Sequence, residues 1–339
     1  MRGKRMMAAG LVLLHMTAAA YAAEIPFIEK IDPAYRDGAQ TMMYQYTSDE
    51  AVRAAQEAFD ALPPQLPEPE TVLAPGAEPG LTVPLYVYRP EKIEQGPLPV
   101  VYYSHGGGYL LRRVLGARSG FQAMADRMGA IVITPKYRLS VEEPFPAALL
   151  DVYAGLQYVA AHGQELGMDT SRIILMGDSA GGGLSASLAL YNRDHDNIPL
   201  KGQILIYPML DYRTGTKDSV YHAPYTGVVC WTRESNAYAW ERLRGGQTID
   251  PEWMPYFSPS MAKDLSGLPP VMIYTGDLDL FVNEDLDYAN RLIEAGVSTE
   301  VHVIPGLYHA FDSANKEAAP TAAFIKETTE TAKDMFAHA

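Results

Sequence analysis

The sequence predicts an α/β fold in which helices cover both faces of one mostly parallel sheet. Short apolar runs have the length and character of buried parallel strands. Helical segments alternate with these runs, which implies right-handed crossovers. The chain has 339 residues, 47% of them hydrophobic, so it can bury a large core.

The expected strands are apolar runs bounded by turn residues, and they lie at 83–88, 98–103, 130–134, 173–176, 203–208, 271–275 and 299–304. Helical patterns lie between them at 117–128, 146–162, after Ser179 and at 284–294.

Three further segments fall outside this alternation. Residues 24–60 are expected to be helical and amphipathic, because alanines and Phe59 recur at helical spacing. Residues 62–80 form a proline-rich connector that cannot make a regular helix. The aromatic-rich span of about 210–265 is predicted to be an insertion packed over the edge of the sheet.

The N-terminus has the pattern of an export signal. A basic start with Arg2, Lys4 and Arg5 precedes a mostly apolar stretch, and small residues end it near Ala22. We expect a cleaved signal peptide at 1–22, and therefore a periplasmic or secreted protein. The alternative is an N-terminal helix of a cytoplasmic protein. No other segment approaches eighteen consecutive apolar residues, so no stable membrane span is expected.

Charge and cysteine content exclude several kinds of function. The net charge is −14, from 41 acidic and 27 basic residues, which argues against nucleic acid as a partner and favours neutral or apolar ligands. The single cysteine excludes an intrachain disulfide and a metal site built from several thiolates.

Residues 173–183 carry the first chemical signal. Gly177 and Gly181 stand two residues on either side of Ser179, between an apolar run and a helix. This spacing is typical of a strained turn that projects the serine oxygen from the sheet edge. The serine would also lie near the positive end of the following helix. The alternative is a glycine-rich turn whose serine only caps that helix.

A serine nucleophile needs a base and a carboxylate, and both occur in loops after strands. Asp277 and Asp279 follow the strand at 271–275, and His309 follows the strand at 299–304. Serine, then acid, then histidine is the order expected of an α/β-hydrolase. The order leaves both aspartates open as the acid.

The loop at Gly106, Gly107 and Gly108 offers backbone N–H groups for an oxyanion, together with the N–H of Ala180. A phosphate-binding loop is the alternative, but no Gly-Lys-Ser/Thr follows.

These motifs together resemble the hormone-sensitive-lipase-like branch of the α/β-hydrolases, a family of bacterial esterases. The resemblance runs from about Val83 to the C-terminus and rests on HGGGY, YRLSVEEPFPAALLD, GDSAGG, SPSMAKDLSGLPPVMIYTGDLDLFVNED and GLYHAF. It implies Ser179 as nucleophile, His309 as base and Asp279 as acid, because Leu280-Phe281 stand where the family carries Pro-Leu. Asp277 falls at a position that the family varies. Asp178 and His105 are then expected to support the loops.

The resemblance further implies a carboxylesterase for short to medium acyl chains, acting through an acyl-enzyme without metal or cofactor. Residues 23–339 would form the hydrolase domain, with 24–60 and the insertion as its cap. The partner would be a small-molecule ester, and a homodimer is one option for its assembly. The alternatives are an amidase or a deacetylase of acylated sugars or xenobiotics, and a ligand-binding receptor. Receptors that resemble this family depart from it at the catalytic histidine, which is present here as His309.

Overall fold

The computed structural model describes residues 25–63, 65–92, 96–112 and 117–338. The signal peptide predicted at 1–22 lies outside these ranges and stays a prediction. Within them, no helix has the length and apolar character needed to cross a lipid bilayer.

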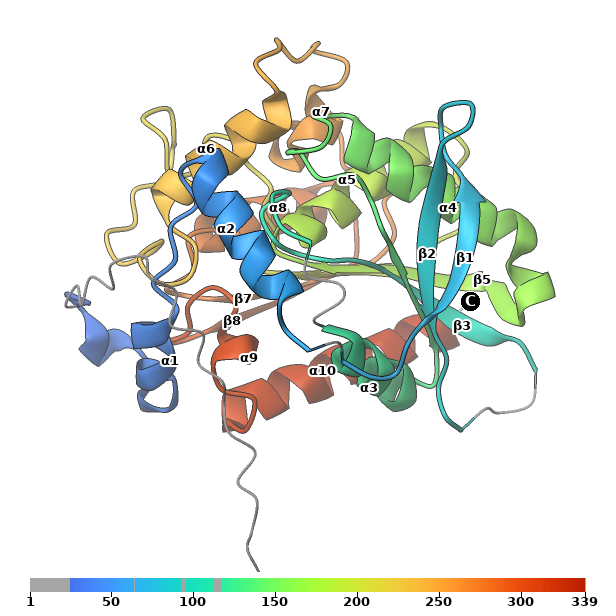
Figure 1. The fold of residues 1–339 in the computed structure, drawn as a ribbon, viewed down its shortest axis with the longest axis horizontal. Coiled ribbons are helices and arrows are strands. Elements are labelled where there is room, and N and C mark those ends of the chain that lie inside the picture. The colour runs from blue at the N-terminus through green and yellow to red at the C-terminus, as the bar shows by residue number, and fades with distance from the viewer. Residues whose placement is uncertain (1–24, 64, 93–95, 113–116, 339) are drawn as a thin grey trace, which may run out of the picture.

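A mostly parallel sheet forms the centre of the described chain (Figure 1). Its strand order is β1-β2-β4-β3-β5-β6-β7-β8, and only the β1–β2 and β2–β4 pairs are antiparallel. The strands are β1 (Glu70–Pro75), β2 (Thr82–Tyr88), β3 (Leu98–Ser104), β4 (Ile131–Pro135), β5 (Met168–Asp178), β6 (Gly202–Ile206), β7 (Val271–Gly276) and β8 (Thr299–Ile304). The predicted fold class is confirmed.

Helices cover both faces of the sheet. Alternate side chains of each strand point to opposite faces, so Val100 and Tyr102 of β3 enter one core while Val101 and Tyr103 enter the other. The first core contains residues of α4 (Ala147–His162), α5 (Ala180–Asp194) and α8 (Val282–Glu294). The second contains residues of α3 (Arg118–Met128) and α10 (Ala319–Ala337). Figure 1 shows α3 and α10 below the sheet and α4 and α5 above it.

The N-terminal segment is less helical than expected. It forms α1 (Arg36–Thr41) and α2 (Asp49–Asp60), with non-helical residues between them. Ser48 caps the N-terminus of α2, because its side chain accepts a hydrogen bond from the N–H of Ala51. The proline-rich connector contains strand β1, which the sequence did not predict. The insertion is partly helical, with α6 (Arg233–Arg244) and α7 (Met254–Phe257).

The N-terminal segment and the insertion contact each other. The N–H of Tyr46 donates to Ser235 Oγ at 2.9 Å, and Asp49 of α2 pairs with Arg242 of α6 at 3.4 Å. Figure 1 shows α2 and α6 close together at the upper left. The two segments predicted to form a cap are therefore joined to one another.

Candidate active site

The predicted site residues come together at one edge of the sheet. Ser179 follows β5, His309 follows β8, and Asp279 lies in the loop after β7. The glycine-rich loop follows β3. These four strands run parallel, so their carboxyl ends meet at the same edge.

Ser179 sits on a strained turn. Its φ is 56° and its ψ is −124°, a backbone conformation that L-residues rarely adopt. A methyl group on Gly181 would overlap the backbone of Ser104 and His105, and one on Gly177 would overlap the backbone of Gly181. Only glycine fits at both positions, which confirms the elbow that the sequence predicted.

A chain of hydrogen bonds joins the three residues. His309 Nε2 lies 2.9 Å from Ser179 Oγ, and His309 Nδ1 lies 2.8 Å from Asp279 Oδ2. Asp279 Oδ1 accepts a hydrogen bond from the N–H of Phe281 at 2.9 Å, which fixes the orientation of the carboxylate. With Nδ1 protonated toward Asp279, Nε2 is free to accept the serine proton.

Asp277 takes no part in this chain. Its side chain is exposed, and Oδ1 accepts a hydrogen bond from the N–H of Gly306 at 2.7 Å. Asp277 therefore ties the loop after β7 to the loop that carries His309, while Asp279 contacts the imidazole.

In the glycine-rich loop, the structure contradicts the prediction that Gly106 is an oxyanion donor. The N–H of Gly106 donates to Asp178 Oδ1 at 2.9 Å, so it is already engaged and is not available to an oxyanion. Gly107 and Gly108 have φ of 126° and 65°, which glycine adopts readily. In the described chain, the backbone hydrogen bonds leave the N–H groups of Gly107 and Gly108 free. Ala180 opens α5, where N–H groups lack partners within the helix.

Asp178 and His105 support this loop, as expected. Asp178 Oδ1 also accepts a hydrogen bond from the Tyr103 hydroxyl at 2.8 Å. His105 Nδ1 lies 2.8 Å from the carbonyl oxygen of Gly106, and its ring stacks on Tyr137 at 4.5 Å. Both side chains thus hold Gly106 in place.

Three aromatic rings surround the imidazole, and sequence reasoning gave none of them a place there. The ring centroids of Tyr207, Phe281 and Trp231 lie 4.7, 5.2 and 6.4 Å from that of His309. Burial raises the pKa of Tyr207 well above its usual value, so the phenol stays neutral and donates to Asp312 Oδ1 at 2.7 Å. Because Asp312 lies three residues after His309, this bond links the end of β6 to the histidine loop.

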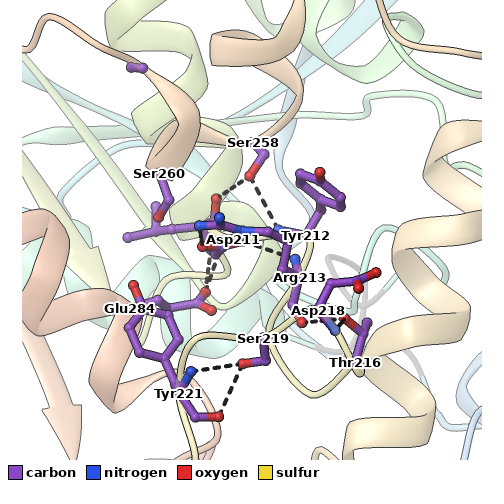
Figure 2. A network of polar contacts seen from close by, with 12 residues as sticks. Asp211, Tyr212, Arg213, Thr216, Asp218, Ser219, Tyr221, Ser258, Ser260 and Glu284 are labelled. Atoms are coloured by element: carbon purple, nitrogen blue, oxygen red, sulfur yellow. Dashed lines mark hydrogen bonds and ion pairs between the residues drawn. The ribbon is translucent and has the colours of Figure 1, made fainter.

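A polar network fixes the start of the insertion beside the elbow (Figure 2). The N–H of Met209 donates to the carbonyl oxygen of Ser179 at 3.0 Å. The next two N–H groups, of Leu210 and Asp211, donate to Oε1 of Glu284 at 2.6 and 3.2 Å. Asp211 in turn pairs with Arg213 at 2.6 Å. Burial raises the pKa of Glu284 well above its usual range, and the neighbouring Asp211 raises that pKa further.

We expect Glu284→Ala to lower the free energy of unfolding by about 3 kcal/mol, because it leaves two buried N–H groups without an acceptor and opens a cavity. Urea unfolding measures this loss. Glu284→Gln keeps one acceptor oxygen and should lose less than half as much. Asp287→Ala changes an exposed residue of the same helix and should stay within about 0.5 kcal/mol of the original protein. Equal losses for Glu284→Ala and Asp287→Ala would contradict the anchoring role.

The surroundings of the site offer space rather than metal ligands. Within the described ranges, no group of three or more His, Cys, Asp and Glu side chains could hold a metal ion.

A cleft of about 1370 Å³ lies between α2 and the helices α3 and α10. Its wall includes Gly106 and Asp178 beside Ser179, and Tyr207 and Ala310 beside His309.

Known proteins resemble this chain over most of its length. A family described as having the alpha/beta hydrolase fold matches residues 101–313. Carboxylesterase NlhH of Mycobacterium tuberculosis is 34% identical over 287 residues, covering 83% of this chain and 88% of the relative. Esterase LipI of the same organism is 31% identical with the same coverage. A solved structure described as a bacterial heroin esterase is 30% identical with a TM-score of 0.83, covering 91% of this chain and 99% of that one. These relatives confirm the expected resemblance to bacterial esterases.

Proposed function

This chain belongs to the alpha/beta hydrolase fold family and is a carboxylic ester hydrolase, and we propose that Ser179, His309 and Asp279 carry out its reaction. The observation that carries the proposal is the hydrogen-bond chain from Asp279 through His309 to the Ser179 hydroxyl. The strained turn supports it, because that turn aims the serine oxygen away from the sheet.

In the first half of the reaction, Ser179 Oγ attacks the ester carbonyl carbon while His309 Nε2 takes the hydroxyl proton. The carbonyl oxygen becomes an oxyanion, which the N–H groups of Gly107, Gly108 and Ala180 stabilise. The negative charge of Asp279 stabilises the imidazolium. When the intermediate collapses, the bond to the alcohol oxygen breaks, and His309 gives that oxygen its proton.

The second half releases the acid. Water attacks the acyl-enzyme as His309 takes one of its protons, and the same N–H groups stabilise the second oxyanion. Collapse of this intermediate breaks the bond to Ser179 Oγ, which regains its proton from His309. The net reaction consumes one ester and one water and gives a carboxylic acid and an alcohol.

The substrates we propose are esters of short to medium acyl chains, with residues 24–60 and the insertion shielding the site from water. The contacts between Tyr46 and Ser235 and between Asp49 and Arg242 support this cap, because they join the two segments. The buried side chains of Ser179 and His309, 6% and 4% exposed, support a shielded site.

A matched pair of substrates tests the function. We expect the purified protein to cleave p-nitrophenyl acetate and to leave p-nitroacetanilide essentially uncleaved, because the amine is a far poorer leaving group than the phenol. Comparing kcat/KM for the two substrates measures the preference. Equal or faster cleavage of the amide would contradict the ester assignment and favour the amidase alternative.

A further inference from the structure

We propose that Trp231 closes the acyl side of the active site, so that this enzyme is built for esters joining a short acyl group, acetyl to butanoyl, to a bulky alcohol. This inference rests on the proposed function of Ser179 and His309, and adds to it the shape of the substrate.

Trp231 stands directly against the reaction centre. A methyl group on Gly108 would overlap the six-membered ring of the indole, so the ring packs on an oxyanion donor with no room between them. The same ring lies 6.4 Å from the imidazole of His309, centroid to centroid. A chain growing from the carbonyl carbon toward this side would meet the indole within a few bonds.

The indole is held in place. Its Nε1–H donates to Asn236 Oδ1 at 3.0 Å, and Asn236 Nδ2 donates to the carbonyl oxygen of Thr214 at 2.7 Å. The ring of Tyr46 lies 5.9 Å from the indole, and the backbone of Tyr46 is tied to Ser235. Trp231 is only 4% exposed, so it forms a packed wall rather than a surface side chain.

The cleft described above is lined by residues other than Trp231 and its neighbour Tyr46. The cleft of about 1370 Å³ reaches Tyr207 and Ala310 next to His309, and its wall includes neither Trp231 nor Tyr46. Such a volume can hold a group much larger than an acetyl chain.

The chemistry assigns the two halves of the ester to these two sides. The alcohol oxygen must lie next to His309 Nε2, because that nitrogen gives it a proton as it leaves. The cleft reaches Tyr207, whose ring packs on the imidazole of His309, and Ala310, the next residue along the chain, so we assign the alcohol to the cleft. The acyl group takes the remaining direction, toward the side that Trp231 closes.

Two substrate series on Trp231→Ala test this assignment. The first varies the acyl chain of p-nitrophenyl esters from acetate to octanoate, and the second varies the alcohol of acetate esters from methyl to naphthyl. We expect Trp231→Ala to raise the ratio of kcat/KM for octanoate to that for acetate by about tenfold to a hundredfold. The profile in the alcohol series should stay unchanged.

Trp253→Ala is the matched control, since Trp253 belongs to the same insertion and packs on Phe145 and Tyr191 instead. It should keep the original acyl profile. Trp231→Phe retains an aromatic ring and should shift the ratio by less than Trp231→Ala, which gives a second reading if the alanine variant folds poorly.

An acyl profile unchanged in both Trp231 variants, or a change confined to the alcohol series, would overturn the inference. So would an original enzyme that cleaves octanoate and acetate equally well, although its proposed function would then stand. A protein that cleaves no ester of either series would overturn both.

Discussion

Replacing Ser179 with alanine is expected to lower kcat for p-nitrophenyl acetate by about a millionfold. The substitution removes the oxygen that attacks the carbonyl carbon, and neither His309 nor Asp279 can form the acyl-enzyme in its place. The residual rate would come from the oxyanion donors and from substrate binding. Initial rates of the purified variant at saturating substrate measure the change.

The loss must come from chemistry and not from unfolding. The variant should keep the urea midpoint of the original protein, because alanine has the same backbone limits as serine at φ 56° and the exchange removes a single oxygen atom. Ser185→Ala is the matched control: Ser185 lies in α5, which Ser179 precedes, and its hydroxyl donates to the carbonyl oxygen of Met176 at 3.1 Å. That variant should lose about 1 kcal/mol of stability and keep its turnover. Turnover retained in Ser179→Ala would exclude Ser179 as the nucleophile.

The sequence predicts the parallel core well because buried parallel strands are continuous apolar runs. Ile173 and Leu175 are buried on one face of the sheet and Ile174 and Met176 on the other, and a run that is apolar on both faces allows few other structures. The sequence does not predict strand β1, because it is an edge strand in which only Ala74 is buried. Its sequence, Glu-Thr-Val-Leu-Ala-Pro, lies within the proline-rich connector and does not alternate between apolar and polar residues.

The sequence does not predict helix α10, for a related reason. Its buried positions include threonines as well as aromatic residues, namely Thr321, Phe324, Thr328, Ala332 and Phe336. The hydroxyl of Thr328 donates to the carbonyl oxygen of Phe324 at 2.7 Å, which satisfies the polar group within the helix. A polar residue at a core-facing position interrupts the apolar pattern by which an amphipathic helix is recognised.

Some features of the site can be predicted from local sequence patterns, whereas others depend on contacts between distant parts of the chain. Ser179, His309 and the glycine-rich loop carry local patterns after strands, so the sequence could place them. That Gly106 is already engaged depends on Asp178, which lies 72 residues further along the chain. Trp231 comes from an insertion without periodicity, so only the folded chain brings it to Gly108.

Asp279→Asn is expected to lower kcat by about ten thousandfold while leaving the fold intact. Oδ1 of the new amide would still accept the hydrogen bond from the N–H of Phe281, so its Nδ2 would face His309 Nδ1. An amide nitrogen only donates, which forces the imidazole proton from Nδ1 to Nε2. His309 could then no longer accept the proton of Ser179. Flipping the amide would not restore the original arrangement, because its Nδ2 would then face the N–H of Phe281, and both groups are donors.

Asp277→Asn decides between the two aspartates, because the same chemical change two residues earlier should leave kcat within about threefold of the original enzyme. Asparagine can still accept the hydrogen bond from Gly306 through its side-chain oxygen, and position 277 does not contact the imidazole. Steady-state rates of both variants, measured on the same ester at the same pH, give the comparison. A greater loss in Asp277→Asn than in Asp279→Asn would exclude Asp279 as the partner of His309, since the imidazole tautomer would then be set from elsewhere.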